Sequence, residues 1–156
     1  TGDGVIYSGA KQFIDEEAQS ILYQPDTLSS WPYRIKENMM KFRETVKKHV
    51  AAGKIVAGYG APTKATLLMD MSELGGSDIS FMVEDNLLKV DKFMPGTGIP
   101  ILDVAELQQR KPSIIVIFAW NFSDDIIFKL KADVDWPAKF LVPLPDFVEE
   151  NCNGVS

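Results

Sequence analysis

Cysteine and histidine are almost absent from the sequence, which contains only Cys152 and His49 among its 156 residues. One thiol cannot form a disulfide within the chain, and one cysteine with one histidine cannot supply a cysteine-rich zinc site. The same scarcity argues against a catalytic relay built around a histidine base. We therefore expect no metal site, a surface or helix-capping role for His49, and an ordinary thiol at Cys152.

Long hydrophobic runs are also missing, because no apolar stretch approaches the roughly 20 residues that cross a bilayer. The chain does not open with a basic segment followed by an apolar one, which is the pattern of a secretory signal. With 46% hydrophobic and 10% aromatic residues, the composition is nevertheless that of a folded chain. Its length fits one domain with a sizeable core. We expect a cytoplasmic protein without a membrane partner.

An excess of positive charge is the third absence, since the formal net charge is −6. Residues 1–53 hold seven acids and seven bases, whereas residues 54–156 hold fifteen acids and nine bases. An acidic body repels a nucleic-acid backbone, and no stripe of Lys or Arg interleaved with aromatics offsets this repulsion. We therefore expect no nucleic-acid partner.

Hydrophobic periodicity divides the chain into helices and strands. Helical spacing occurs over residues 10–23, from 28 or 30 to 52, and over 63–73, 103–110 and 124–132. Strand-like runs occur over 54–58, 79–84, 114–119 and 139–142, and residues 92–101 predict a turn with a short edge strand at 99–102. This alternation predicts a three-layer α/β fold, with a mostly parallel sheet preceded by a long N-terminal helix. The domain should cover 30–147, after a leader with a short helix over 1–29 and before a polar tail over 148–156.

The most informative corner lies at residues 55–68, where a β-branched run meets Gly58 and Gly60 and then a helical pattern. At such a strand-to-helix corner, backbone N–H groups and the helix dipole point outward, and glycines allow positive φ and close approach of a ligand. Lys64 in the first helical turn favours a shared anion such as a phosphate. The spacing is neither the dinucleotide fingerprint nor a P-loop. A plain tight turn with a solvated Lys64 is therefore the competing interpretation.

Four segments should meet at the carboxyl edge of the sheet, where ligands bind in such folds, namely 59–64, 84–86, 119–122 and 143–145. Asp85 stands where a ribose hydroxyl would be held, although an acid there is also a common turn-former. Trp120 and Asn121 offer a flat ring and an amide that suit a sugar or a base. A tryptophan that anchors the strand end in the core is the alternative.

Four stretches together resemble one family: 58–64 (GYGAPTK), 93–101 (FMPGTGIPI), 118–126 (FAWNFSDDI) and 140–145 (FLVPLP). In order and approximate spacing they look like the C-terminal domain of S-adenosylmethionine-dependent sugar C-methyltransferases, over residues 30–147. The chain departs from the family pattern in two places. Thr63 and Ala65 flank Lys64 where the family has alanine and glycine, and Gly98 stands where the family has a histidine.

The resemblance implies a division of labour among three domains. An N-terminal module binds zinc, a central domain binds S-adenosylmethionine, and a Rossmann-like C-terminal domain helps to enclose a nucleoside-diphosphate keto-sugar. This chain matches only the third, which implies no catalytic residue and no cofactor here, and a catalytic domain of the same full-length protein as its partner. The substrate-binding residues carried over or placed at the same edge are Gly58, Tyr59, Gly60, Lys64, Asp85, Trp120 and Asn121.

Two other functions remain open from the sequence. The chain is a self-standing nucleotide-binding or dinucleotide-binding module if Gly58, Gly60 and Asp85 hold the cofactor. It is a structural or dimerisation domain if the long helix, from Trp31 to Val50, packs on a partner.

Overall fold

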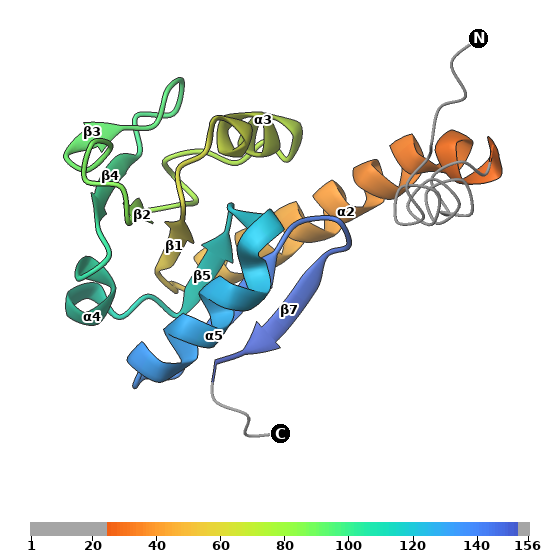
Figure 1. The fold of residues 1–156 in the computed structure, drawn as a ribbon. Coiled ribbons are helices and arrows are strands. Elements are labelled where there is room, and N and C mark those ends of the chain that lie inside the picture. Colours follow the sequence, from red (N-terminus) through yellow and green to blue (C-terminus); the bar gives the residue numbers. More distant parts are fainter. Residues whose placement is uncertain (1–24, 153–156) are drawn as a thin grey trace, which may run out of the picture. The chain divides into compact units, whose positions relative to one another are not determined.

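The structure is a computed structural model that describes residues 25–152 of the chain (Figure 1). It divides into two compact units, 1–34 and 35–156, and the second unit holds the whole sheet. The long N-terminal helix is confirmed as α2 (Pro25–Ala51). The helix predicted over 10–23 lies outside the described residues, and the domain limits at 29 and 147 stay predictions.

The sheet contains seven strands in the order β3-β4-β2-β1-β5-β6-β7. Their bounds are β1 (Val56–Tyr59), β2 (Phe81–Glu84), β3 (Lys92–Phe93), β4 (Pro100–Asp103), β5 (Ile114–Ile117), β6 (Lys139–Val142) and β7 (Val148–Asn151). The five inner strands are parallel, and the two edge strands are antiparallel to their neighbours. The chain leaves β1 toward β2 on one side and returns to β5 on the other. The carboxyl ends of β1 and β5 therefore form a topological switch point, which is where ligands bind in open α/β sheets.

Helices cover both faces of this sheet. Successive residues of β5 alternate between two cores, with Ile114 and Val116 in one and Ile115 and Ile117 in the other, as the two-residue period of a strand requires. The first core includes residues of α2 and of α3 (Thr63–Met71), and the second includes residues of α4 (Glu106–Arg110) and α5 (Ser123–Asp133). The predicted three-layer α/β fold is thereby confirmed.

The two edges of the sheet differ from the sequence prediction. The strand expected at the edge over 99–102 is β4, and it is covered by β3, which pairs Lys92 with Ile101. At the other edge, residues 148–151 of the expected polar tail form β7 beside β6. In Figure 1 these two edges lie on opposite sides of the drawn sheet. Both missed strands are short or polar, so neither has the apolar pattern that marks a strand in a sequence.

Cys152 and His49 are both more buried than the sequence predicts. Cys152 is buried in the second core, its Sγ lies 3.8 Å from the Val134 carbonyl oxygen, and burial raises the pKa of its thiol. His49 is also buried, and burial together with the charge of Lys54 lowers its pKa. The expected surface position of His49 is therefore wrong, whereas the helix-capping alternative stays a prediction, since His49 lies in the last turn of α2.

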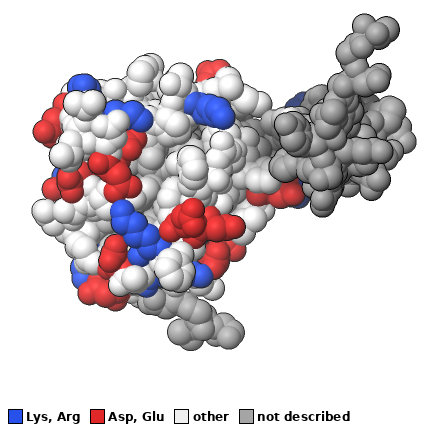
Figure 2. All heavy atoms as spheres, viewed as in Figure 1, with Lys and Arg blue, Asp and Glu red and all other residues white. Residues whose placement is uncertain are grey.

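Charged side chains of one sign form no long stripe on the face drawn in Figure 2. Figure 2 shows Lys and Arg side chains interspersed with Asp and Glu over this face. Within residues 25–152, no helix combines the length and the apolar character needed to cross a membrane.

Candidate functional site at the switch point

Gly60 brings the loops after β1 and β5 into contact. Its φ is +81°, and a Cβ added to it would lie 3.0 Å from the Cβ of Ala119. Its N–H donates to the Val83 carbonyl at 2.8 Å, which ties the loop to the end of β2. A side chain would therefore strain the backbone and separate the loops, so this corner requires glycine.

Gly58 has a different reason to be glycine. It lies inside β1 without a positive φ, and an added Cβ would lie 2.3 Å from the Met82 sulfur and 2.9 Å from a Phe118 ring carbon. Both neighbours belong to the buried core. The expectation that Gly58 supplies positive φ at a ligand is therefore not met, because the strand interior is packed on that face.

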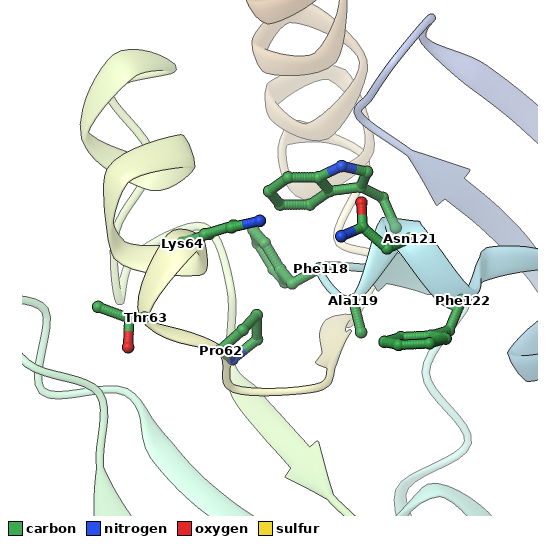
Figure 3. Close-up of a pocket in the computed structure, with 8 residues that line it drawn as sticks. Pro62, Thr63, Lys64, Phe118, Ala119, Asn121 and Phe122 are labelled. Carbon is green, nitrogen blue, oxygen red and sulfur yellow. The ribbon is translucent and has the colours of Figure 1, made fainter. Parts of the chain in front are cut away.

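A cavity of about 250 Å³ opens between the start of α3 and the loop after β5. We call it the aromatic pocket, and it is lined by Pro62, Thr63, Lys64, Phe118, Ala119, Trp120, Asn121 and Phe122. Trp120 and Asn121 belong to the 3₁₀ helix η2 (Trp120–Phe122), which the chain forms directly after β5. Figure 3 shows the Lys64 side chain extending from α3 toward this loop, while the Thr63 side chain points away.

The polar groups of the aromatic pocket are uncommitted. The Lys64 ammonium lies 5.4 Å from the centroid of the Trp120 ring, a distance at which a cation is attracted to the ring face. Within residues 25–152, no hydrogen bond or ion pair engages the Lys64 ammonium or the Asn121 amide. Pro62, the residue before α3, provides no side-chain cap, and in the first turn the Ala65 N–H donates to the Pro62 carbonyl at 2.9 Å.

A second cavity, of about 330 Å³, adjoins the first and shares Pro62, Ala119 and Phe122 with it. We call it the carboxylate pocket, because Glu84 and Asp85 line it together with Tyr59, Gly60, Lys89 and Ile126. The charged groups of this second pocket are all held by other parts of the protein.

Glu84 closes the glycine corner from the side of β2. Its carboxylate accepts hydrogen bonds from the Ala61 N–H at 2.9 Å and from the Lys89 ammonium at 3.1 Å, and Lys89 also donates to the Ala61 carbonyl. Burial alone would raise the pKa of Glu84, but these bonds and that of the Asn86 N–H hold the pKa below its usual range. The Ala61 N–H at the glycine corner is thus occupied by a side chain of the protein itself. The sequence analysis places the segment 84–86 at this edge, but neither Glu84 nor Lys89 is among its predicted site residues. The signal for the pair is an acid at the last strand position with a lysine five residues later.

Asp85 links three elements. One carboxylate oxygen accepts from the Tyr59 hydroxyl at 2.5 Å, and the other accepts from the Lys129 ammonium at 3.1 Å. The Tyr59 bond is the main reason that the pKa of Asp85 is lowered. Burial, and then the hydrogen bond to Asp85, raise the pKa of Tyr59. Asp85 therefore ties the end of β2 to β1 and α5 in this structure.

The predicted site residues separate into three groups. Lys64, Trp120 and Asn121 come together in the aromatic pocket. Tyr59, Gly60 and Asp85 line the carboxylate pocket, and Gly58 lies in the core. The fourth predicted segment, 143–145, instead supports the fold, because the Pro145 carbonyl accepts from the Asn38 amide at 2.8 Å.

No metal centre accompanies these pockets. Within residues 25–152, no group of three or more His, Cys, Asp or Glu side chains is placed to hold a metal ion. The fold and the two cavities define an α/β domain with two hollows at the switch point of a mostly parallel sheet.

Comparison with known proteins identifies the family. Residues 6–145 match the family described as "C-methyltransferase C-terminal domain", and the chain belongs to this family. A curated relative is the C-methyltransferase NovU of Streptomyces niveus, which is 38% identical over 106 residues. The matched region covers 68% of this chain but only 25% of that relative's length. The resemblance drawn from the sequence motifs to a C-methyltransferase C-terminal domain is confirmed.

One solved structure gives a more distant likeness. The crystal structure of UDP-D-quinovosamine 4-dehydrogenase from Vibrio fischeri is 20% identical and superposes with a TM-score of 0.43. The likeness covers 60% of this chain and 79% of that one.

Proposed function

We propose that this chain is the C-terminal domain of a sugar C-methyltransferase and that it binds a nucleoside-diphosphate keto-sugar at the carboxyl ends of β1 and β5. In this proposal, S-adenosylmethionine donates the methyl group from another domain of the full-length protein. The observation that carries the proposal is the aromatic pocket, where an uncommitted ammonium and an uncommitted amide lie beside Trp120.

The chemistry of the pocket suits a ligand with a ring and an anionic group. Aromatic side chains supply flat apolar surface, and an amide supplies both a donor and an acceptor. The Lys64 ammonium supplies a positive charge for a phosphate. Direct contacts are assigned to Lys64, Trp120 and Asn121, whereas Tyr59, Gly60 and Asp85 shape the adjoining carboxylate pocket.

The methyl donor fits the pocket less well than the sugar nucleotide. A sulfonium cation would lie close to the Lys64 ammonium, and like charges repel. A zinc ion has no set of ligands here, since the sequence contains one cysteine and one histidine and both are buried. S-adenosylmethionine and zinc are therefore assigned to other domains of the full-length protein.

Methyl transfer to carbon needs a base that forms an enolate and a fixed angle of attack. The aromatic pocket contains no carboxylate or imidazole, and the carboxylates of the adjoining pocket are engaged by Lys89, Lys129 and backbone N–H groups. The role proposed for this domain is therefore to hold and orient the substrate.

Calorimetric titration of this chain tests the proposal. A thymidine-diphosphate hexose is titrated into the wild type, Lys64→Ala and Lys111→Ala, with NADH and S-adenosylmethionine as parallel ligands. Lys111 is the matched control, because its ammonium also lies over an indole, 5.7 Å from the Trp136 ring centroid. We expect the sugar nucleotide to bind and Lys64→Ala to weaken it about tenfold, since a charge-assisted contact contributes about 1.5 kcal/mol or more.

Each result has a distinct meaning. Lys111→Ala should bind as the wild type does. Absence of binding by the sugar nucleotide would overturn the proposal of a site within this chain. Tight binding of NADH would favour a dinucleotide-binding module instead, and equal affinity of the wild type and Lys64→Ala would place the anion elsewhere.

A further inference from the structure

We infer that this domain holds the nucleotide half of the sugar nucleotide, with the base in the aromatic pocket and the phosphates at Lys64. The hexose then projects out of the pocket. This inference rests on the proposed function, and it assigns the two halves of the ligand to different places.

The first step is size. Pockets that enclose a drug-sized ligand usually have volumes of about 300–1,000 Å³. The aromatic pocket, at about 250 Å³, is smaller than this range. A nucleoside-diphosphate hexose is larger than most drug-sized ligands, so the aromatic pocket holds one part of it.

The second step is polarity. Phe118, Trp120 and Phe122 surround this space with mostly aromatic carbon. Apart from the backbone and Thr63, the polar groups of its lining residues are the Asn121 amide, the Lys64 ammonium and the indole N–H of Trp120. A hexose carries hydroxyls around its whole ring, and burying hydroxyls without partners is costly. A base has two apolar faces for stacking and a short polar edge, which one amide can bind through its donor and acceptor.

The third step is the position of the anion. In the carboxylate pocket the Ala61 N–H and the Lys89 ammonium are both taken by Glu84, and Lys129 is taken by Asp85. A phosphate there would displace a carboxylate and face the two acids. Lys64 has no such competitor within residues 25–152, and it extends toward the loop that carries Asn121 (Figure 3). The two pockets share Pro62, Ala119 and Phe122, and of the two it is the aromatic pocket that presents a lysine without an acidic partner among the described residues.

Truncated ligands test this assignment. Thymidine diphosphate, glucose 1-phosphate and thymidine-diphosphate glucose are each titrated into the wild-type chain. We expect thymidine diphosphate to bind within about tenfold of the complete sugar nucleotide and glucose 1-phosphate to bind about 100-fold more weakly or not at all. Saturation-transfer NMR on the complete ligand should give stronger signals at the base protons than at the hexose protons.

Two variants connect the result to the pocket. Trp120→Ala and Asn121→Ala should each weaken thymidine diphosphate about fivefold or more, because stacking and edge hydrogen bonds are lost. Lys111→Ala should not change its affinity. Asn121 is exposed, so its variant remains informative if Trp120→Ala is unstable.

The outcomes separate the inference from the proposed function. If the complete sugar nucleotide binds but glucose 1-phosphate retains most of the affinity, or if the hexose protons receive the strongest saturation, the inference is overturned and the proposed function stands. If thymidine diphosphate binds equally to the wild type and Asn121→Ala, the base lies elsewhere. If no ligand binds, both are overturned.

Discussion

Two lysine–tryptophan pairs lie at opposite ends of the strands and differ in burial and in their hydrogen-bond and ionic partners. Trp136 precedes β6 at the amino edge and is buried, and its indole N–H donates to the Pro112 carbonyl at 2.8 Å. Trp120 follows β5 at the carboxyl edge and is only partly buried. A lysine lies over each ring, Lys111 at 5.7 Å and Lys64 at 5.4 Å from the centroid.

The lysines differ as much as the rings. Lys111 also approaches the Asp135 carboxylate at 3.4 Å, whereas Lys64 has no acidic partner within residues 25–152. The same two residue types therefore form part of the scaffold at one edge and line an open pocket at the other. What distinguishes the two pairs is whether hydrogen-bond and ionic partners are already in place, and this depends on the tertiary structure.

Truncating the two indoles should separate the pairs most strongly. We expect Trp136→Ala to lower the free energy of unfolding by about 3–5 kcal/mol, because it leaves a large cavity in the core, and the Pro112 carbonyl loses its donor. Trp120→Ala should cost less than half as much, since the ring is partly solvated. Denaturant unfolding followed by circular dichroism measures both losses.

Lys111→Ala controls for the cation above the ring. Exposed ionic contacts contribute at most about 1 kcal/mol, so this variant should unfold close to the wild type. Equal losses from the two tryptophan variants would show that Trp120 is a core anchor, which is the alternative that the sequence left open.

The sequence predicts the scaffold better than the edges. The near-continuous apolar run of β5 and the alternation of strands with helices are local patterns, and they identify four of the five inner parallel strands, β1, β2, β5 and β6. The two-residue β3 and the polar β7 have no such pattern, because their partners β4 and β6 supply the ladder that defines them.

The candidate site could be predicted only in part for the same reason. Lys64, Trp120 and Asn121 follow strand ends in the sequence, so the rule for parallel sheets brought them to one place. The use of the Ala61 N–H by Glu84 depends on contacts between neighbouring strands, which no spacing along the chain reveals. The packing of Gly58 cannot be seen in the sequence for a similar reason, since its neighbour Met82 comes from β2.

The same contrast between scaffold and pocket holds at the glycine corner. Gly58 lies next to the candidate site, but its contacts belong to the buried core. We expect Gly58→Ala to lower the free energy of unfolding by about 1–3 kcal/mol through overpacking against Met82 and Phe118. Thermal and denaturant unfolding measure this loss. A double variant with Met82→Ala should lose less than the sum of the single variants, since the clash is removed.

Gly53→Ala is the matched control for backbone strain. Gly53 has a φ of +72° with nothing within 4 Å of an added Cβ, whereas Gly58 has the reverse situation. Gly53→Ala should therefore lower the free energy of unfolding by about 1 kcal/mol, because of its positive φ alone. Its effect should add to that of Met82→Ala. Additive losses from Gly58→Ala and Met82→Ala would refute the packing explanation.

The smallest effect we expect is in the pH dependence caused by Glu84. Burial would raise the pKa of Glu84, but hydrogen bonds from Ala61 and Asn86 and the Lys89 ammonium lower it below the usual 4.5. A carboxyl whose pKa is lower in the folded state contributes stability above its unfolded pKa, and this contribution is lost as the pH falls through the folded pKa. Glu84→Gln should therefore show a shallower loss of unfolding free energy than the wild type on acidification from about pH 5 to pH 3.

Asp78→Asn provides the comparison at the amino edge. Asp78 precedes β2, and its pKa is likewise lowered, with burial opposing the bonds from Lys47 and Gly75. Both variants should reduce the loss of unfolding free energy on acidification, but only Glu84→Gln alters a group at the carboxyl edge of the sheet.

Because the neutral amide leaves the Ala61 N–H and Lys89 without a carboxylate, we expect Glu84→Gln to tolerate phosphate in the carboxylate pocket better than Asp78→Asn does. Phosphate-induced amide shifts at Ala61 in NMR spectra would measure this, and equal shifts in the two variants would mean that Glu84 does not exclude the anion.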